Sequence, residues 1–145
     1  MVSLREVTAD SVRAICRLQV TDAQSQLVAP NSVSIAQAYF QRDTAWFRAI
    51  YAGEVPVGFV MLYDNPPEAR YFLWRFMIDY QYQGRGFGRR ALELVIAHVR
   101  TRPSAKELLL SHGRTHISPE GFYMRLGFEH TGEMMHDEYV MRLAL

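Results

Sequence analysis

The sequence lacks the features that mark several classes of protein. One cysteine, Cys16, occurs in 145 residues, so we expect no disulfide framework and no thiolate metal site, and we predict no other metal site. No run approaches 18 apolar residues and no signal-peptide core is visible, so a cytoplasmic protein without a membrane segment is expected. The formal net charge of +1 provides no basic surface for nucleic acid.

What the sequence does contain is ordinary for a globular domain. Apolar residues make up 49% of the chain and charged residues 21%, and both fractions are typical of a protein with one buried core. At this length we predict a single domain spanning residues 1–145. No internal repeat, linker or low-complexity segment divides it.

Hydrophobic periodicity predicts about seven strands and about four helices. Antiparallel strands come first and one long helix follows, which indicates an α+β fold with a mixed, mostly antiparallel sheet. The expected strands are residues 3–7, 46–51, 55–63, 71–78, 107–111, 128–134 and 139–143, and the expected helices run near residues 12–19, 32–40, 91–99 and 120–126.

A glycine-rich turn lies between a strand and the long helix. The apolar run 73–78 is followed by Gln83-Gly84-Arg85-Gly86-Phe87-Gly88 and then by helical spacing. Such a turn can direct backbone N–H groups and the positive end of the helix dipole at a phosphate. A tight turn with no ligand is the simpler alternative. A P-loop is excluded because no Gly-Lys-Ser/Thr follows, and four strand-like stretches precede the turn, which does not suit a dinucleotide-binding fold.

The N-terminal part of the chain contains a polar loop, residues 24–31, between two short helices. These helices and their loop form either a lid over a site or a plain helical hairpin packed on the sheet. The pattern does not decide between the two.

Two motifs together resemble the GNAT (GCN5-related) N-acetyltransferase superfamily. The first is Gln83-x-x-Gly86-x-Gly88 after a strand, and the second is Phe122-Tyr123-x-x-x-Gly127-Phe128 about 40 residues later. The first is similar to the acetyl-CoA pyrophosphate loop of that family. The second is similar to its C-terminal helix, which carries a tyrosine near the CoA sulfur. The resemblance implies the GNAT fold over the whole chain and acetyl-CoA as co-substrate.

Within the superfamily the sequence is most similar to the bacterial spermine/spermidine acetyltransferase type. The segments that carry this likeness are Gln24-x-x-Leu27-Val28-Ala29-x-Asn31, Trp74 to Asp79, and Ser118 to Tyr123. A polyamine site should contain several acidic residues, and the sequence shows no such cluster. The amine acceptor therefore stays open between a polyamine and another small primary amine.

The resemblance implies a set of cofactor-binding residues. Backbone amides of the glycine turn would hold the pyrophosphate, arginines would add charge, and the end of the preceding strand would offer backbone groups to the pantetheine. The residues concerned are Met77, Ile78, Gln83, Gly84, Arg85, Gly86, Phe87, Gly88, Arg89 and Ser111.

Tyr123 is the candidate general acid, because a phenol can protonate the leaving thiolate; packing is its alternative role. No general base stands out among Glu54, Glu68, Asp79 and Glu120, and ordered water serves equally well.

Candidate substrate-binding residues are Gln24, Asn31 and Trp74, although Trp74 is equally suited to the core.

The function expected from the resemblance is acetylation of a small primary amine by direct transfer in a ternary complex. The alternatives are acetylation of a protein amine or an aminoglycoside, and a CoA-binding sensor without turnover. The resemblance also allows a homodimer through the C-terminal strands, which the sequence itself does not show.

Overall fold

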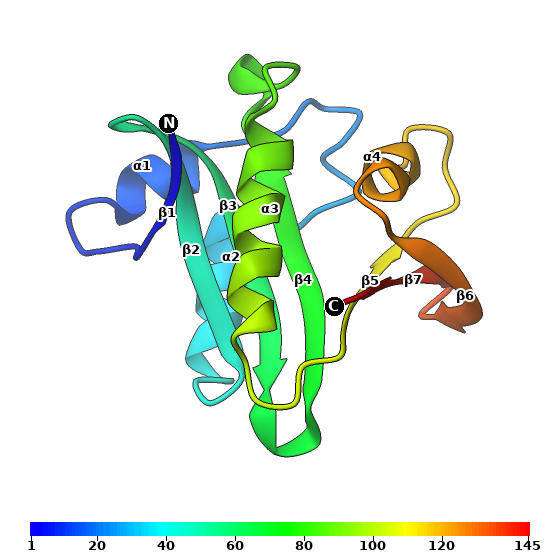
Figure 1. Cartoon of the computed structure of the whole chain (residues 1–145). Helices are drawn as coiled ribbons and strands as arrows, with labels where there is room; N and C mark the ends of the chain where they lie inside the picture. The colour runs from blue at the N-terminus through cyan, green and yellow to red at the C-terminus, as the bar shows by residue number, and fades with distance from the viewer.

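The computed structural model describes residues 1–145 as one seven-stranded sheet with helices on both faces (Figure 1). The sheet order is β1-β2-β3-β4-β5-β7-β6. The strands are β1 (Val2–Arg5), β2 (Ala45–Ala52), β3 (Val55–Asn65), β4 (Arg70–Ile78), β5 (Glu107–His112), β6 (Glu129–Met135) and β7 (Glu138–Ala144). The helices are α1 (Val12–Arg17), α2 (Asn31–Tyr39), α3 (Phe87–Arg100) and α4 (Glu120–Arg125), with short 3-10 turns η1 (Pro66–Glu68) and η2 (Tyr80–Tyr82).

The pairing of the strands confirms the predicted mixed α+β sheet. Strands β1 to β4 pair antiparallel in sequence order, and β5, β7 and β6 form a second antiparallel group. The two groups join through the parallel pair of β4 and β5, with α3 as the connecting helix. A parallel pair needs such a crossover because a tight turn can only reverse the chain. None of the helices has both the length and the apolar character that a membrane crossing requires.

Two hydrophobic cores lie on opposite faces of the sheet. The larger one packs α3 and α4 against the sheet through residues such as Leu92, Val95 and Tyr123. The smaller one packs α1 and α2 through Ile15 and Ala38. Figure 1 shows α3 on one face of the strands and α2 on the other. The N-terminal helices thus form a helical pair packed on the sheet.

Local sequence explains where α3 begins and ends. Gly86 is its N-cap with φ of 82°, a left-handed conformation that glycine adopts without a steric penalty. Residues Ala91, Leu92, Val95, Ile96 and Val99 recur at helical spacing and are all buried. Arg100 occupies the last turn, where positive charge complements the helix dipole.

The observed boundaries agree with the predicted ones to within a few residues, with one informative difference. The polar loop ends earlier than predicted, because Asn31 is the first residue of α2 and Pro30 is its N-cap. Proline has no N–H group to lose at a helix start, and its fixed φ suits that position.

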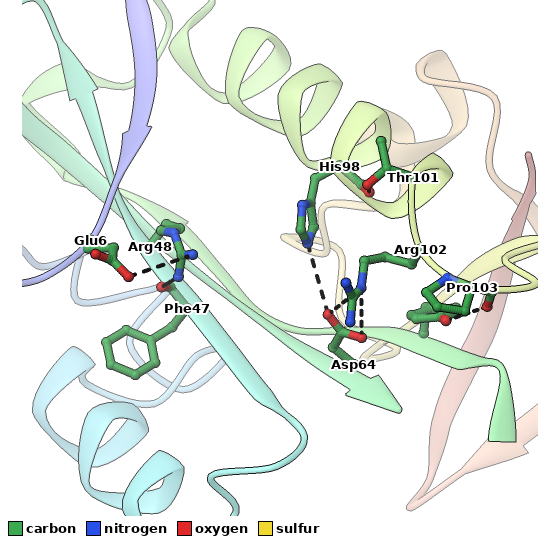
Figure 2. Close-up of polar contacts among 9 residues, drawn as sticks. Glu6, Phe47, Arg48, Asp64, His98, Thr101, Arg102 and Pro103 are labelled. Atoms are coloured by element: carbon green, nitrogen blue, oxygen red, sulfur yellow. Dashed lines mark hydrogen bonds and ion pairs between the residues drawn. The ribbon is translucent and has the colours of Figure 1, made fainter. Parts of the chain in front are cut away.

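A buried carboxylate ties the end of β3 to the end of α3 (Figure 2). Asp64 Oδ2 lies 3.0 Å from Arg102 Nε and 3.9 Å from His98 Nε2. The imidazole of His98 stacks on Trp46 with ring centroids 4.3 Å apart. Tyr71 donates a hydrogen bond of 2.6 Å to the Pro103 carbonyl and fixes the chain that follows the helix.

Candidate active site

A cleft opens where β4 and β5 diverge. These strands share a single paired position, Phe72 with Leu109, so further along β4 the backbone edge that faces β5 has no strand partner. Figure 1 shows β5 and β7 turning away from β4. The resulting cleft has a volume of about 1190 Å³ and is lined by both strands, the glycine turn, α4 and the loop before α2. This size lies just above the usual range of small-molecule sites, about 300–1,000 Å³.

A β-bulge in β4 shapes one wall of the cleft. Met61 pairs with Arg75 and Leu62 with Leu73, so Trp74 is the extra residue. Bulges redirect side chains next to functional sites, and both Trp74 and Arg75 line the cleft here. Beyond the bulge, Met77 and Ile78 also line the cleft, although their side chains are largely buried in the two cores.

The glycine turn presents a row of free backbone donors at the cleft. The amides from Gln83 to Arg89 donate no hydrogen bond within the protein, and the first bond in this segment is Arg90 N–H to the Gly86 carbonyl at 3.2 Å. Gly84 and Gly86 have φ of 79° and 82°, and at both positions the space that a Cβ would occupy is open. Unpaired amides at the start of a 14-residue helix form a site suited to an anion. This geometry fits the diphosphate of a CoA thioester.

The polar side chains of the turn play different roles. Gln83 Nε2 donates to the Ile78 carbonyl and to Gln24 Oε1, both at 2.9 Å, so it braces the turn against β4 and the N-terminal loop. Arg89 lines the cleft and pairs with Glu93 at 3.1 Å. Arg85 does not line the cleft and instead donates to the Gln81 carbonyl at 3.3 Å.

Tyr123 extends from α4 into the cleft with 7% of its surface exposed. Its ring packs edge-on against Phe122 and Phe128, with centroids 5.5 and 5.7 Å away. Its hydroxyl makes no hydrogen bond to the protein. Burial raises the pKa of this phenol, so the hydroxyl keeps its proton through the physiological range. A protonated hydroxyl at the cleft with no partner in the protein is able to donate a proton to a bound group.

One acidic residue of the cleft was not predicted from the sequence. Glu138 is the only carboxylate among the lining residues, and its Oε1 accepts a hydrogen bond of 2.7 Å from Ser111 Oγ. The two residues meet because β5 pairs with β7, where Ser111 lies opposite Val140. Arg70, Arg75, Arg89 and Arg125 also line the cleft. No local pattern in the sequence signals this pairing.

The three candidate substrate-binding residues lie in different environments. Gln24 and Trp74 line the cleft. Asn31 does not, because its side chain is 2% exposed and its Nδ2 donates to the Ile15 carbonyl at 2.9 Å. Asn31 therefore joins α2 to α1 in the smaller core. Of all the sequence-predicted site residues, the structure gathers every one except Asn31 and Arg85 around one cleft.

Sequence comparison identifies relatives over most of the chain. The sequence profile of the acetyltransferase (GNAT) family matches residues 12–128. A spermine/spermidine N(1)-acetyltransferase from Bacillus subtilis (strain 168) is 30% identical over 142 residues, which cover 92% of this chain and 91% of the relative.

Structural comparison finds the same fold in solved acetyltransferases. The PaiA N-acetyltransferase from Thermoplasma acidophilum, crystallised with coenzyme A, aligns with a TM-score of 0.71 and 14% identity over 100% of this chain and 99% of its own. A GNAT family acetyltransferase from Elizabethkingia anophelis with acetyl-CoA bound aligns with a TM-score of 0.69 and 14% identity over 99% and 98% of the two chains. With the fold, the cleft between β4 and β5 and the matched family profile in agreement, the chain belongs to the acetyltransferase (GNAT) family.

Proposed function

We propose that this acetyltransferase uses acetyl-CoA to acetylate a primary amine of a small molecule. The observation that carries the proposal is the row of free amides from Gln83 to Arg89 beside a cleft that also holds the hydroxyl of Tyr123. Amides at a helix N-terminus bind diphosphate. Acetyl-CoA supplies the acyl group in activated thioester form. The protein has to hold this group and orient an amine beside it. It also has to remove a proton from the ammonium group and give a proton to the leaving sulfur.

Orientation is the first contribution of the cleft. The unpaired edge of β4 near Met77 and Ile78 offers backbone groups to the amides of a pantetheine arm. Ser111 lines the opposite wall. Holding two reactants in a reactive geometry supplies about 7–11 kcal/mol of the barrier in favourable cases. Positioning can thus supply a large part of the rate enhancement before any proton moves.

Tyr123 is the proposed general acid. When the amine nitrogen bonds to the acetyl carbon and the carbon–sulfur bond breaks, the sulfur leaves with the electron pair of that bond and takes the phenolic proton. The nitrogen, which carries a positive charge after the attack, releases one proton to solvent, and the phenolate regains a proton from solvent. A free thiol has a pKa of about 8.5 and a free phenol about 10, so the transfer is uphill in water. Burial raises the pKa of the Tyr123 phenol. A thiol taken out of water beside Tyr123 would have its pKa raised as well, which limits the additional cost.

The amine must lose its proton before it attacks. An alkylammonium with a pKa of about 10.4 costs about 4.6 kcal/mol to deprotonate at neutral pH. Glu138 is the one carboxylate positioned in the cleft to bind the ammonium and to receive its proton, directly or through water. Because the carboxylate also accepts from Ser111, its orientation is fixed before the amine arrives.

The charge of the cleft bears on the choice of amine. The names of the relatives make spermidine and spermine the first acceptors to test. One carboxylate can pair with one ammonium group, whereas four arginines line the same cleft and repel further cationic groups. A polyamine therefore has to direct its other ammonium groups to solvent, and a monoamine avoids this requirement.

We also propose that the chain forms a homodimer through its C-terminal strands. Strand β6 is at one end of the sheet, so its outer edge has unpaired backbone groups that a second chain can use.

Thiol release from acetyl-CoA in the presence of an amine panel tests the main proposal. The panel contains spermidine, spermine and primary monoamines, and tertiary amines of matched skeleton serve as controls because they cannot form a stable amide. We expect release with at least one primary amine and none with its tertiary analogue. Binding of CoA without release for any amine would replace this proposal with a CoA sensor.

A further inference from the structure

A second cluster of ionisable groups lies beside the cleft and has no part in the proposed acetyl transfer. His112 ends β5, Glu120 is the first residue of α4 and His130 lies on β6. One nitrogen or oxygen atom from each of these side chains lies within 4.8 Å of the other two. The three residues come from separate elements and are brought together by the fold alone.

The hydrogen bonds of His112 fix its tautomer. Its ring is buried, and Nδ1 lies 2.9 Å from both the Gly113 carbonyl and Ser118 Oγ. A carbonyl oxygen only accepts, so Nδ1 carries the proton and donates it. Nε2 of His112 is then the unprotonated nitrogen, and its lone pair faces His130. A histidine held at one nitrogen by a carbonyl oxygen is the usual arrangement of a metal ligand.

The other two groups complete a set of donors. Nε2 of His130 lies 3.0 Å from Nε2 of His112 and 3.9 Å from Oε1 of Glu120. In tetrahedral zinc sites the metal–ligand distance is about 2.0–2.2 Å, which places ligand atoms about 3.3–3.5 Å apart. The separation between His112 and His130, 3.0 Å, is shorter than that value, and the separation between His130 and Glu120, 3.9 Å, is longer. The third separation, between His112 and Glu120, is within 4.8 Å. His130 and Glu120 are partly exposed, so their side chains have room to rotate toward a shared ion.

We propose that His112, Glu120 and His130 form a binding site for a divalent transition-metal ion, with zinc as the best fit. Two imidazoles and a carboxylate are the donors that zinc accepts, and the absence of thiolates disfavours softer ions. Three protein ligands leave a fourth position for water or a solute.

The metal would fasten together the elements that surround the general acid. Glu120 precedes Tyr123 by one helical turn on α4, and His130 follows α4 on β6. The Tyr139 ring packs against both imidazoles, with centroids 5.5 and 5.8 Å away. A bound ion therefore links β5, α4 and β6, which stabilises the folded chain over the unfolded one.

Titration of metal-free protein with zinc chloride, followed by calorimetry, tests the proposal. Cobalt chloride followed by visible absorption reports whether the bound ion is four-coordinate. We expect one zinc ion per chain and a rise in Tm that a chelator reverses. His130→Ala and Glu120→Gln should each weaken zinc binding at least about 10-fold, since even the outer partners of metal ligands contribute that much.

His116→Ala is the matched control, because His116 is exposed and outside the cluster, and it should bind zinc like the wild type. Both test residues are partly exposed, and circular dichroism verifies that the variants fold. Zinc affinity that is the same in His130→Ala as in the wild type would overturn the proposal. So would a wild type that binds neither ion, and the contact between His112 and His130 would then be a hydrogen bond between two imidazoles.

Discussion

The hydroxyl of Tyr123 lines the cleft without a hydrogen-bond partner in the protein. If this group protonates the leaving thiolate, Tyr123→Phe removes the proton donor and keeps the ring that packs against Phe122 and Phe128. We expect turnover to fall by about 10²-fold or more, because general acid catalysis contributes about 10²–10⁴-fold. Steady-state thiol release measures turnover, and calorimetry measures CoA affinity, which should change little.

Tyr51→Phe provides the control for this change. Tyr51 lies on β2 outside the cleft, where its ring supports the Arg5 guanidinium at 4.4 Å, so the loss of its hydroxyl should leave turnover intact. Unchanged turnover in Tyr123→Phe would assign Tyr123 a packing role, and solvent would then be the proton donor.

The position of a residue in the cleft was predictable where it depends on neighbours in the sequence. Tyr123 follows from its motif on α4, and the polar side chain of Gln24 follows from its loop. Glu138 was not predictable, because it enters the cleft through the pairing of β5 with β7. Asn31 was predicted to lie in the loop. Pro30 is instead the N-cap of α2, so Asn31 begins the helix and its side-chain amide donates to the Ile15 carbonyl.

The glycine turn at the start of α3 is the element on which cofactor binding depends. A valine at Gly86 needs φ near 82°, where a β-branched residue is strained by about 1–2 kcal/mol. Relief of this strain rotates the peptide groups, so the amides between Gln83 and Arg89 no longer converge on one anion. We expect Gly86→Val to weaken CoA binding at least about 10-fold, which corresponds to about 1.4 kcal/mol. Calorimetric titration with CoA measures the change.

Gly53→Val is the control that distinguishes the effect of backbone strain on stability from the loss of the CoA-binding turn. Gly53 has φ of 60° in the turn between β2 and β3, and like Gly86 it has no atom near the position of an added Cβ. Both variants should lose similar stability, and Gly53→Val should bind CoA like the wild type. Equal CoA affinity in all three proteins would show that the turn does not hold the cofactor.

The helices and strands were easier to predict from the sequence than the cleft that opens between β4 and β5. The apolar run before the turn predicts strand β4, and the helical spacing after it predicts α3. The sequence does not reveal that β4 and β5 share a single paired position or that β4 bulges at Trp74. Both features depend on how α3 and the C-terminal strands pack, and the cleft is a consequence of both.

At the scale of the whole molecule, the two hydrophobic cores support different parts of the cleft from opposite faces of the sheet. The face with α3 and α4 holds the glycine turn and Tyr123, and the face with α1 and α2 supports the bulged part of β4. Helical and strand periodicity predicted this α+β architecture, since both patterns record which side of each element is buried. Polar contacts that cross between elements, such as Asp64 with His98, leave no such pattern.

The burial of His98 beside Asp64 makes the free energy of unfolding decrease as pH falls. Burial lowers the pKa of His98, although the nearby Asp64 acts in the opposite sense and Arg102 and Arg48 favour the neutral form. The folded state therefore holds a neutral imidazole at a pH where the unfolded state, with a pKa of about 6.5, already binds a proton. The free energy of unfolding is highest above that value and should decrease as pH falls through it, by at most about 1.4 kcal/mol per pH unit for one group.

His98→Phe isolates this contribution. A phenyl ring can keep the stacking on Trp46, shown in the protein by ring planes 15° apart, and it does not titrate. Urea unfolding at about pH 7.5 and about pH 5.5, on either side of the unfolded pKa, should show a smaller loss of stability for the variant than for the wild type. The other ionisable groups are the same in both proteins, so their contributions cancel in the comparison. A larger loss in the variant would mean that attraction to Asp64 outweighs burial and raises the pKa of His98 in the folded chain.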